Sequence, residues 1–196
     1  MRSKAPDLLP IFRSTHQAEL LAWLYLHPGT EHTISQLAMR LGVSQSTLHR
    51  EVERLVAAGL IRDRAIGRNR LLSAATDHRA AMPLTQLLAV TFGPLTVVAD
   101  EFATVPGVES VHIYGSWAAR YEGTPGPPPS DVDVLVVGQP SRTDVYAAAD
   151  RAQDRLGIPV NSSMRTPAQW QDPSDPLVQQ IKTSPLVTVI AGEDLR

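Results

Sequence analysis

The spacing of apolar residues predicts three helices in the first 60 residues. Leu20, Leu21 and Leu24 recur at the three- and four-residue spacing of a helix face that packs on a core. Ser44 precedes the third apolar pattern as a helix cap, and Gly59 follows it, where helices commonly end in a left-handed turn. The predicted helices span residues 17–26, 34–41 and 45–58.

A hairpin pattern follows the third helix. Leu60-Ile61 and Leu71-Leu72 are short apolar runs, and a polar, arginine-rich segment with Gly67 lies between them. Such a pattern is typical of two antiparallel strands joined by a turn. The order helix, helix, turn, helix and hairpin predicts a winged helix over residues 1–80, mostly helical with a β-hairpin wing.

From about residue 84 the pattern changes, and helices alternate with strands. Gly93-Pro94 separates two predicted helices, and we interpret residues 81–105 as a helical connector. Residues 132–138 (VDVLVVG) are almost continuously apolar, which predicts a central, buried strand. The expected fold class is therefore α+β with two domains, the second being an α/β domain with a mixed sheet over residues 106–196. The other predicted elements are strands at 110–114, 158–164 and 186–192, helices at 142–156 and 176–182, and a loop that contains Trp170.

Charge divides the chain in the same way. Residues 1–80 hold 11 Lys and Arg against 7 Asp and Glu, whereas residues 81–196 hold 7 against 13. A basic part joined to an acidic part suggests two different tasks. The sequence has no cysteine, which excludes disulfides, thiolate metal sites and cysteine nucleophiles. Because it shows neither a signal peptide nor an apolar run of about eighteen residues, we expect a cytoplasmic protein without membrane contact.

The third predicted helix presents a polar face that suits DNA. In a helix-turn-helix, the N-terminal side chains of the second helix reach base edges in the major groove. Gln pairs with adenine and Arg with guanine, whereas arginines on a wing contact phosphate or the minor groove. The candidate DNA-binding residues are Ser44, Gln45, Ser46, His49, Arg50 and Arg54 on the helix and Arg62, Arg64, Arg68 and Arg70 on the hairpin.

Residues 37–72, LAMRLGVSQSTLHREVERLVAAGLIRDRAIGRNRLL, resemble the winged helix of the ArsR/MarR type of bacterial transcriptional regulators. The resemblance covers roughly residues 15–80. It implies binding to double-stranded DNA, and it implies a homodimer that would match a palindromic site. The alternative is a winged helix that serves only as a protein-interaction module. The arginine-rich wing favours DNA, since an interaction module does not need it.

A second group of candidate residues lies in residues 115–138, GSWAARYEGTPGPPPSDVDVLVVG. Asp131 and Asp133 are two positions apart at the start of a strand, so they point to one side and can hold one or two Mg²⁺ ions. Gly115 allows close approach of the backbone to a triphosphate, and Ser116 can bond its oxygens. The alternative is ordinary: acids that begin a strand often face solvent.

The motif resembles a minimal nucleotidyltransferase domain of the DNA polymerase β type, over roughly residues 95–190. The resemblance implies that Asp131 and Asp133 are catalytic and metal-binding, with Mg²⁺ and an NTP as ligands. It implies nucleotide binding by Gly115, Ser116 and Arg120. The chain departs from the family at its third carboxylate, where the corresponding strand carries Asn161. Asparagine has no charge and cannot act as a base.

The sequence thus predicts a DNA-binding transcriptional regulator whose second domain binds Mg-NTP or a protein partner. One alternative is an enzyme that transfers a nucleoside monophosphate from an NTP to a protein, RNA or small-molecule hydroxyl. Another is the antitoxin of a toxin–antitoxin pair. A third carboxylate within metal-bridging distance of Asp131 and Asp133 would favour the enzyme.

Overall fold

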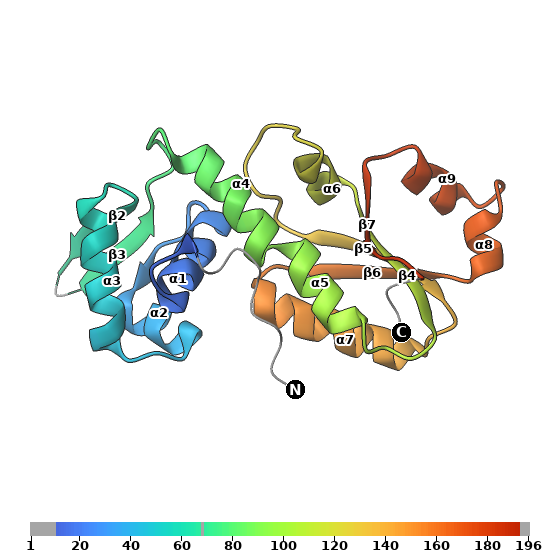
Figure 1. Cartoon of the computed structure of the whole chain (residues 1–196), viewed down its shortest axis with the longest axis horizontal. Coiled ribbons are helices and arrows are strands. Elements are labelled where there is room, and N and C mark those ends of the chain that lie inside the picture. The colour runs from blue at the N-terminus through green and yellow to red at the C-terminus, as the bar shows by residue number, and fades with distance from the viewer. Residues whose placement is uncertain (1–10, 68, 193–196) are drawn as a thin grey trace. The chain divides into compact units, whose positions relative to one another are not determined.

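The computed structural model describes residues 11–67 and 69–192, and the chain forms two compact units, Met1–Gly93 and Pro94–Arg196 (Figure 1). The expected connector contributes one helix to each unit, α4 (Ala81–Phe92) to the first and α5 (Pro94–Phe102) to the second. Pro94 begins α5, at a helix position whose backbone N–H would have no helical partner.

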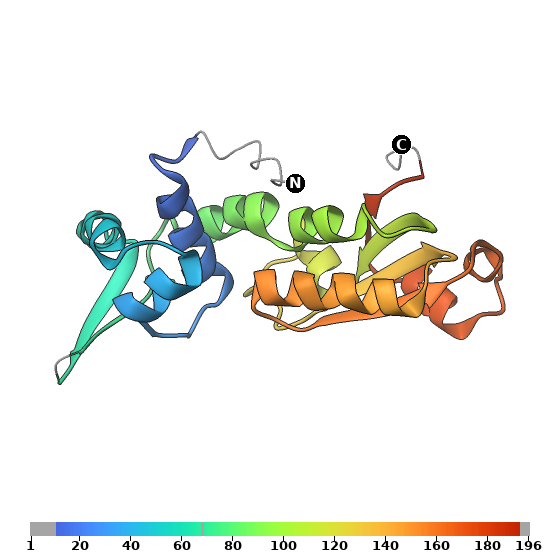
Figure 2. The same cartoon turned by 90° about the horizontal axis from the view of Figure 1, so that it is seen from below.

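The first unit has the predicted arrangement of a winged helix. Its small sheet has the order β1-β3-β2, with antiparallel pairing throughout. The hairpin β2–β3 extends beyond the helices (Figure 2), and β1, which was not predicted, adds two residues at its base. Together with α4, the elements are α1 (Thr15–Leu26), β1 (His32–Thr33), α2 (Ile34–Leu41), α3 (Gln45–Ala57), β2 (Ile61–Ile66) and β3 (Asn69–Ala74).

One apolar core holds the helices of this unit together. Leu20, Leu37 and Leu48 are fully buried, one each from α1, α2 and α3. Full burial of such a side chain contributes about 2 kcal/mol. Helix α4 packs against α1 and adds Leu88 to the same core. The helical spacing in the sequence therefore marked the faces that pack.

The second unit contains the predicted mixed sheet. Its strand order is β6-β5-β4-β7, in which β5 and β6 are parallel and the other neighbours are antiparallel. Strand β5 is central and buried, as its apolar run predicted. Besides α5, the elements are β4 (Val108–Tyr114), α6 (Ser116–Tyr121), β5 (Val132–Gly138), α7 (Arg142–Leu156), β6 (Val160–Arg165), α8 (Pro167–Gln171), α9 (Pro176–Lys182) and β7 (Leu186–Ile190).

The two faces of this sheet differ in character. Val132, Val134 and Val136 alternate along β5, are fully buried and point to the face covered by α5 and α7 (Figure 2). Leu135 and Val137 point to the opposite face and pack with side chains of α8, α9 and β7. Asp133 belongs to this second face by the same alternation.

The prediction of a loop around Trp170 is wrong, because the structure has the short helix α8 there. Thr166 caps α8 and forms a reciprocal pair of hydrogen bonds with Gln169, and Pro167 occupies the first turn. Both features are signals of a helix start that the sequence already carried. The helix is only five residues long, too short to show an apolar period.

An apolar stretch crosses the boundary between α4 and α5. Residues 81–102 have the length of a membrane span, and an 18-residue window within them has a mean hydropathy of 1.5. The stretch is interrupted at Gly93, and 39% of that window is buried within the protein. A core helix of a folded domain meets the same criteria of length and composition.

Candidate functional site

Helix α3 has one buried face and one exposed face. The Oγ of Ser44 accepts a hydrogen bond from the backbone N–H of Thr47 at 3.2 Å, which fixes the start of the helix as predicted. Leu48, Val52 and Leu55 are buried on the core side. Of the predicted DNA-binding residues of this helix and its cap, Ser44, Gln45, Ser46, His49, Arg50 and Arg54 are all exposed.

A buried acid on α3 was not anticipated. Glu51 is only 8% exposed and accepts hydrogen bonds from Gln17 at 3.3 Å and from Arg54 at 3.1 Å. Ser14, the cap of α1, lies 3.5 Å from the same carboxylate. Glu51 therefore connects the start of α1 to the middle of α3, and Arg54 has a structural contact besides its predicted role.

The arginines of the wing are engaged with acids of the protein. Arg64 forms a two-pronged contact with Glu31, with Nε 3.2 Å from Oε1. The hydrogen bond from Arg64 lowers the pKa of Glu31, and Arg64 and Glu31 are both solvent-accessible. The guanidinium thus faces the carboxylate of Glu31, and a DNA phosphate would have to replace that carboxylate.

Arg70 links the wing to α3. Its guanidinium donates to Glu53 of α3 and, at 2.7 Å, to Asp63 of β2. Arg62 pairs with Asp77 at 2.5 Å. Arg68 lies outside the described residues. Three of the four predicted wing arginines therefore have carboxylate partners within the first unit.

These ion pairs reduce the positive charge that the surface offers to DNA. Arg50 has no ion-pair partner among the described residues, and it lies on the exposed face of α3. These pairs could not be predicted from a local pattern, because Glu31 and Arg64 are 33 positions apart and Glu53 and Arg70 are 17 apart. The tertiary fold brings the members of each pair together.

In the second unit, the carboxylates of Asp131 and Asp133 lie on the same side of the sheet, near the start of β5. Asp133 lies opposite Asn161 in the parallel pairing of β5 and β6. The Nδ2 of Asn161 donates to Asp131 at 3.0 Å and to Asp133 at 3.3 Å. The side-chain amide therefore lies between the two carboxylates and supplies an N–H to each of them.

The environment of Asp133 opposes its charge. Partial burial raises the pKa of Asp133, the negative charge of Asp131 raises it further, and the hydrogen bond from Asn161 acts in the opposite direction. A cation between the carboxylates would remove the repulsion between them. The described residues contain no group of three or more His, Cys, Asp or Glu side chains with a metal-binding arrangement.

Gly115, the glycine of the predicted nucleotide motif, lies beside Asp133, and Ser116 follows it. A Cβ on Gly115 would stand 3.2 Å from Oδ2 of Asp133, so a side chain here would crowd the carboxylate. The backbone N–H of Gly115 donates to the carbonyl of Pro185 at 3.2 Å. Ser116 is exposed at the first position of α6. Gly115 thus leaves space beside the carboxylate of Asp133, and its backbone N–H already donates a hydrogen bond to Pro185.

Arg120, predicted to contact nucleotide phosphates, contacts the proline-rich loop in this structure. Its Nε donates to the carbonyl of Pro127 at 3.0 Å, and another guanidinium nitrogen donates to the carbonyl of Thr124 at 3.2 Å. Its guanidinium also occupies the space that a Cβ on Gly126 would need. Arg120 therefore fixes the proline-rich loop that precedes Asp131, and its hydrogen bonds go to carbonyl groups of this loop.

The donor set fits one particular kind of metal site. Mg²⁺ commonly uses one or two carboxylates together with water and substrate phosphates. Asp131 and Asp133 supply such a pair, whereas a cage made of protein atoms alone needs more ligands. An Mg²⁺ ion at this pair would require the Asn161 amide to turn its carbonyl oxygen toward the metal or to move away.

The fold of the first unit, with its hairpin wing and the exposed N-terminal face of α3, is that of a winged-helix DNA-binding domain. Residues 13–70 match the sequence model of the MarR family, which places a MarR-family winged helix in this part of the chain and indicates a DNA-binding transcriptional regulator. Five chains of solved structures match, among them reduced HlyU from Vibrio cholerae N16961. That match has 22% identity and a TM-score of 0.35, and it covers 42% of this chain and 81% of that chain. No curated protein matches.

Proposed function

We propose that the protein is a transcriptional regulator that binds specific DNA sequences through the N-terminal half of α3. Its C-terminal unit binds a ligand or a protein partner. The observation that carries the proposal is the exposed face of α3, on which Ser46 and Arg50 lie together opposite the buried Leu48 and Val52, with Gln45 exposed at the first position of the helix. Gln and Arg are the side chains that read adenine and guanine in the major groove.

The test is the affinity for a labelled duplex of mixed sequence, measured by fluorescence anisotropy at several salt concentrations. Neutralising a phosphate contact flattens the dependence of log K on log salt by about one unit. A duplex of mixed sequence is bound through its phosphates, so we expect Arg50→Gln to weaken binding to it several-fold and to flatten the salt dependence by about this amount.

The matched control is Arg142→Gln, which removes one positive charge from an exposed position at the start of α7. It should leave both affinity and salt dependence unchanged. Equal losses in the two variants would assign the effect to net charge, and they would contradict a DNA-binding role for α3.

For the second unit, we propose that Asp131 and Asp133 bind Mg²⁺ together with the phosphates of an NTP, without efficient transfer of the nucleotide. The contact of Asn161 with both carboxylates supports this part, because it puts an uncharged side chain where a base would be required. The metal would supply charge neutralisation for the phosphates.

The test of this second part is the melting temperature with and without Mg²⁺ and each NTP. A ligand that binds only the folded chain raises this temperature. We expect a rise that depends on Mg²⁺ and is absent in Asp133→Asn, and we expect Asn161→Asp to strengthen the response to Mg²⁺. A melting temperature that no NTP changes would leave the unit without a nucleotide site.

Two features of the expected regulator stay part of the proposal. A homodimer would present two copies of α3 to successive major grooves of a palindromic site. A DNA-binding role also implies that the protein acts in the cytoplasm. An antitoxin that represses its own promoter is one form such a regulator would take, with a protein partner at the second unit.

A further inference from the structure

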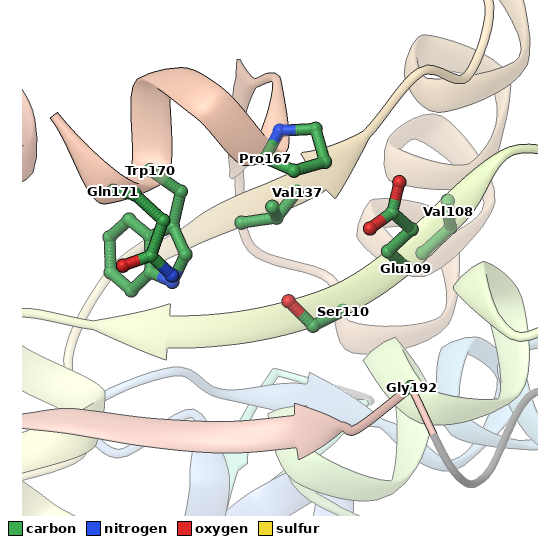
Figure 3. A pocket seen from close by; sticks show the side chains of 8 residues that line it. All are labelled: Val108, Glu109, Ser110, Val137, Pro167, Trp170, Gln171 and Gly192. Atoms are coloured by element: carbon green, nitrogen blue, oxygen red, sulfur yellow. The ribbon is translucent and has the colours of Figure 1, made fainter.

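The second unit contains a cavity of about 510 Å³ beside the sheet (Figure 3). This size lies within the range of small-molecule sites in proteins. Its floor is formed by β4 and β5, and its wall by α8 (Figure 3). The lining residues are Val108, Glu109, Ser110, Val137, Pro167, Trp170, Gln171 and Gly192.

An irregularity of β4 directs two neighbouring polar side chains into this cavity. Successive residues of a regular strand point to opposite faces. Here the pairing of β4 with β5 shifts between Val108 and Ser110, so that Glu109 is an extra residue opposite β5. Such a bulge re-aims a side chain, and bulges are common beside binding sites. Glu109 and Ser110 both line the cavity as a result (Figure 3).

Two glycines make this bulge possible. A Cβ on Gly138 would overlap the carbonyl oxygen of Gly107 and stand 2.9 Å from the backbone nitrogen of Glu109. A Cβ on Gly107 would stand 2.8 Å from the carbonyl oxygen of Gln139. The close approach of the two strand ends therefore depends on glycine at both positions, and it sets the position of Glu109.

The apolar wall of the cavity is held in place from behind. The Trp170 ring stacks with His112 at 5.3 Å between ring centroids, and Lys182 lies 4.5 Å from the centroid of the Trp170 ring. His112 is 7% exposed, and its Nε2 lies 2.9 Å from the Oγ of Ser110. The same histidine thus orients both the aromatic wall and one hydroxyl of the lining.

We propose that this cavity binds a small organic cation, an amine whose apolar body lies against Trp170, Pro167 and Val137 and whose ammonium group pairs with Glu109. Among the eight lining residues, Glu109 is the one with a charged side chain. Residues 81–196 as a whole hold 13 acidic and 7 basic residues, which favours a cation over an anion. The site is separate from Asp131 and Asp133, and this proposal does not depend on nucleotide binding.

The experiment uses the full chain labelled with ¹⁵N and follows the indole N–H resonance of Trp170, identified by its loss in Trp170→Phe. The probes are 2-phenylethylamine, 2-phenylethanol and phenylacetate, which share an aromatic body and differ in charge. We expect the amine to shift this resonance and to bind at least about tenfold more tightly than the alcohol, because a hydrogen bond to a charged group is among the stronger polar contacts.

The variant Glu109→Gln should remove the preference for the amine. The matched control is Glu122→Gln, which removes the same charge from an exposed position of the same unit and should keep the preference. An amine that leaves the Trp170 resonance unchanged at about 10 mM overturns the proposal, since small ligands of this size bind at millimolar concentrations or better. Equal affinity for amine and alcohol, tighter binding of phenylacetate, or an amine preference that survives in Glu109→Gln also overturns it.

Discussion

At the scale of single residues, the charges of the wing are balanced within the protein. Arg64 and Arg70, which a count of basic residues assigns to DNA, each contact a carboxylate in the structure. Exposed ion pairs of this kind contribute little to stability, and they are easily exchanged for other partners. Glu31 and Glu53 would therefore compete with the phosphates of a bound DNA for the same guanidinium groups.

This competition leads to a prediction for Glu31. Glu31→Gln should raise the affinity for a duplex of mixed sequence by a few-fold and steepen its salt dependence by about one unit, because Arg64 becomes available to a phosphate. The measurement is anisotropy at several salt concentrations. Glu122→Gln removes the same charge in the second unit and should have no effect. An unchanged affinity in Glu31→Gln would mean that Arg64 does not contact DNA.

The raised pKa of Asp133 gives a prediction about pH. Because this pKa is higher in the folded chain than in the unfolded chain, the folded state holds the proton more tightly. The free energy of unfolding therefore falls as pH rises from the usual pKa of an aspartate through the raised value, and the loss persists above it. Asp133→Asn should raise the melting temperature at pH 7 without Mg²⁺, and the difference should shrink in acid.

The control for this prediction is Asp150→Asn, on the exposed face of α7, which should leave the melting temperature close to that of the wild type. Thermal melts followed by circular dichroism at pH 4 and pH 7 are sufficient. A lower melting temperature of Asp133→Asn at pH 7 would show that the carboxylate contributes more through its hydrogen bond with Asn161 than it costs through burial and repulsion.

At the scale of elements, the joint between β4 and β5 determines the shape of the cavity. Gly138→Ala places a Cβ against the backbone at Gly107 and Glu109, and the φ of +143° at this position is itself unfavourable for alanine. We expect the free energy of unfolding to fall by about 2 kcal/mol or more. Chemical denaturation measures this loss.

Gly123→Ala separates the two causes of this loss. Gly123 also has a positive φ, of +92°, but a Cβ there meets nothing within 4 Å. It should therefore destabilise the unit by the backbone strain alone, about 1 kcal/mol. If the two variants lose the same amount, steric crowding at the bulge is not the cause.

The sequence predicted elements well where a pattern was long or well bounded. Residues 34–41, 142–156 and 176–182 are helices with the predicted limits. The two-residue strand β1 was missed and the five-residue helix α8 was taken for a loop, because neither is long enough to show a period.

The candidate sites could be predicted only in part. Strand alternation placed Asp131 and Asp133 on one side, and the resemblance to nucleotidyltransferases placed Asn161 beside them, which agrees with the pairing of Asp133 with Asn161 in the structure. The bulge at Glu109 and the partners of the wing arginines depend on contacts between distant parts of the chain. No local pattern reports such contacts.

At the scale of the whole molecule, the chain joins a basic winged helix to an acidic unit with a mixed sheet. The two units divide at Gly93, and the difference in charge follows the same division. DNA would be attracted to the first unit and repelled by the second, so the position of DNA contacts is set by charge as well as by shape. Within the first unit, we propose that α3 is the element that reads the DNA sequence.

The most direct test of that claim is a selection of bound duplexes from a random-sequence pool by the full chain. The account predicts a recurrent motif, arranged as two half-sites about one helical turn apart if the protein acts as a dimer. It also predicts that the variant Gln45→Ala with Arg50→Ala loses the enrichment. A pool that stays random with the wild-type chain, or a motif that persists in this variant, would contradict the assignment of α3 as the element that reads DNA.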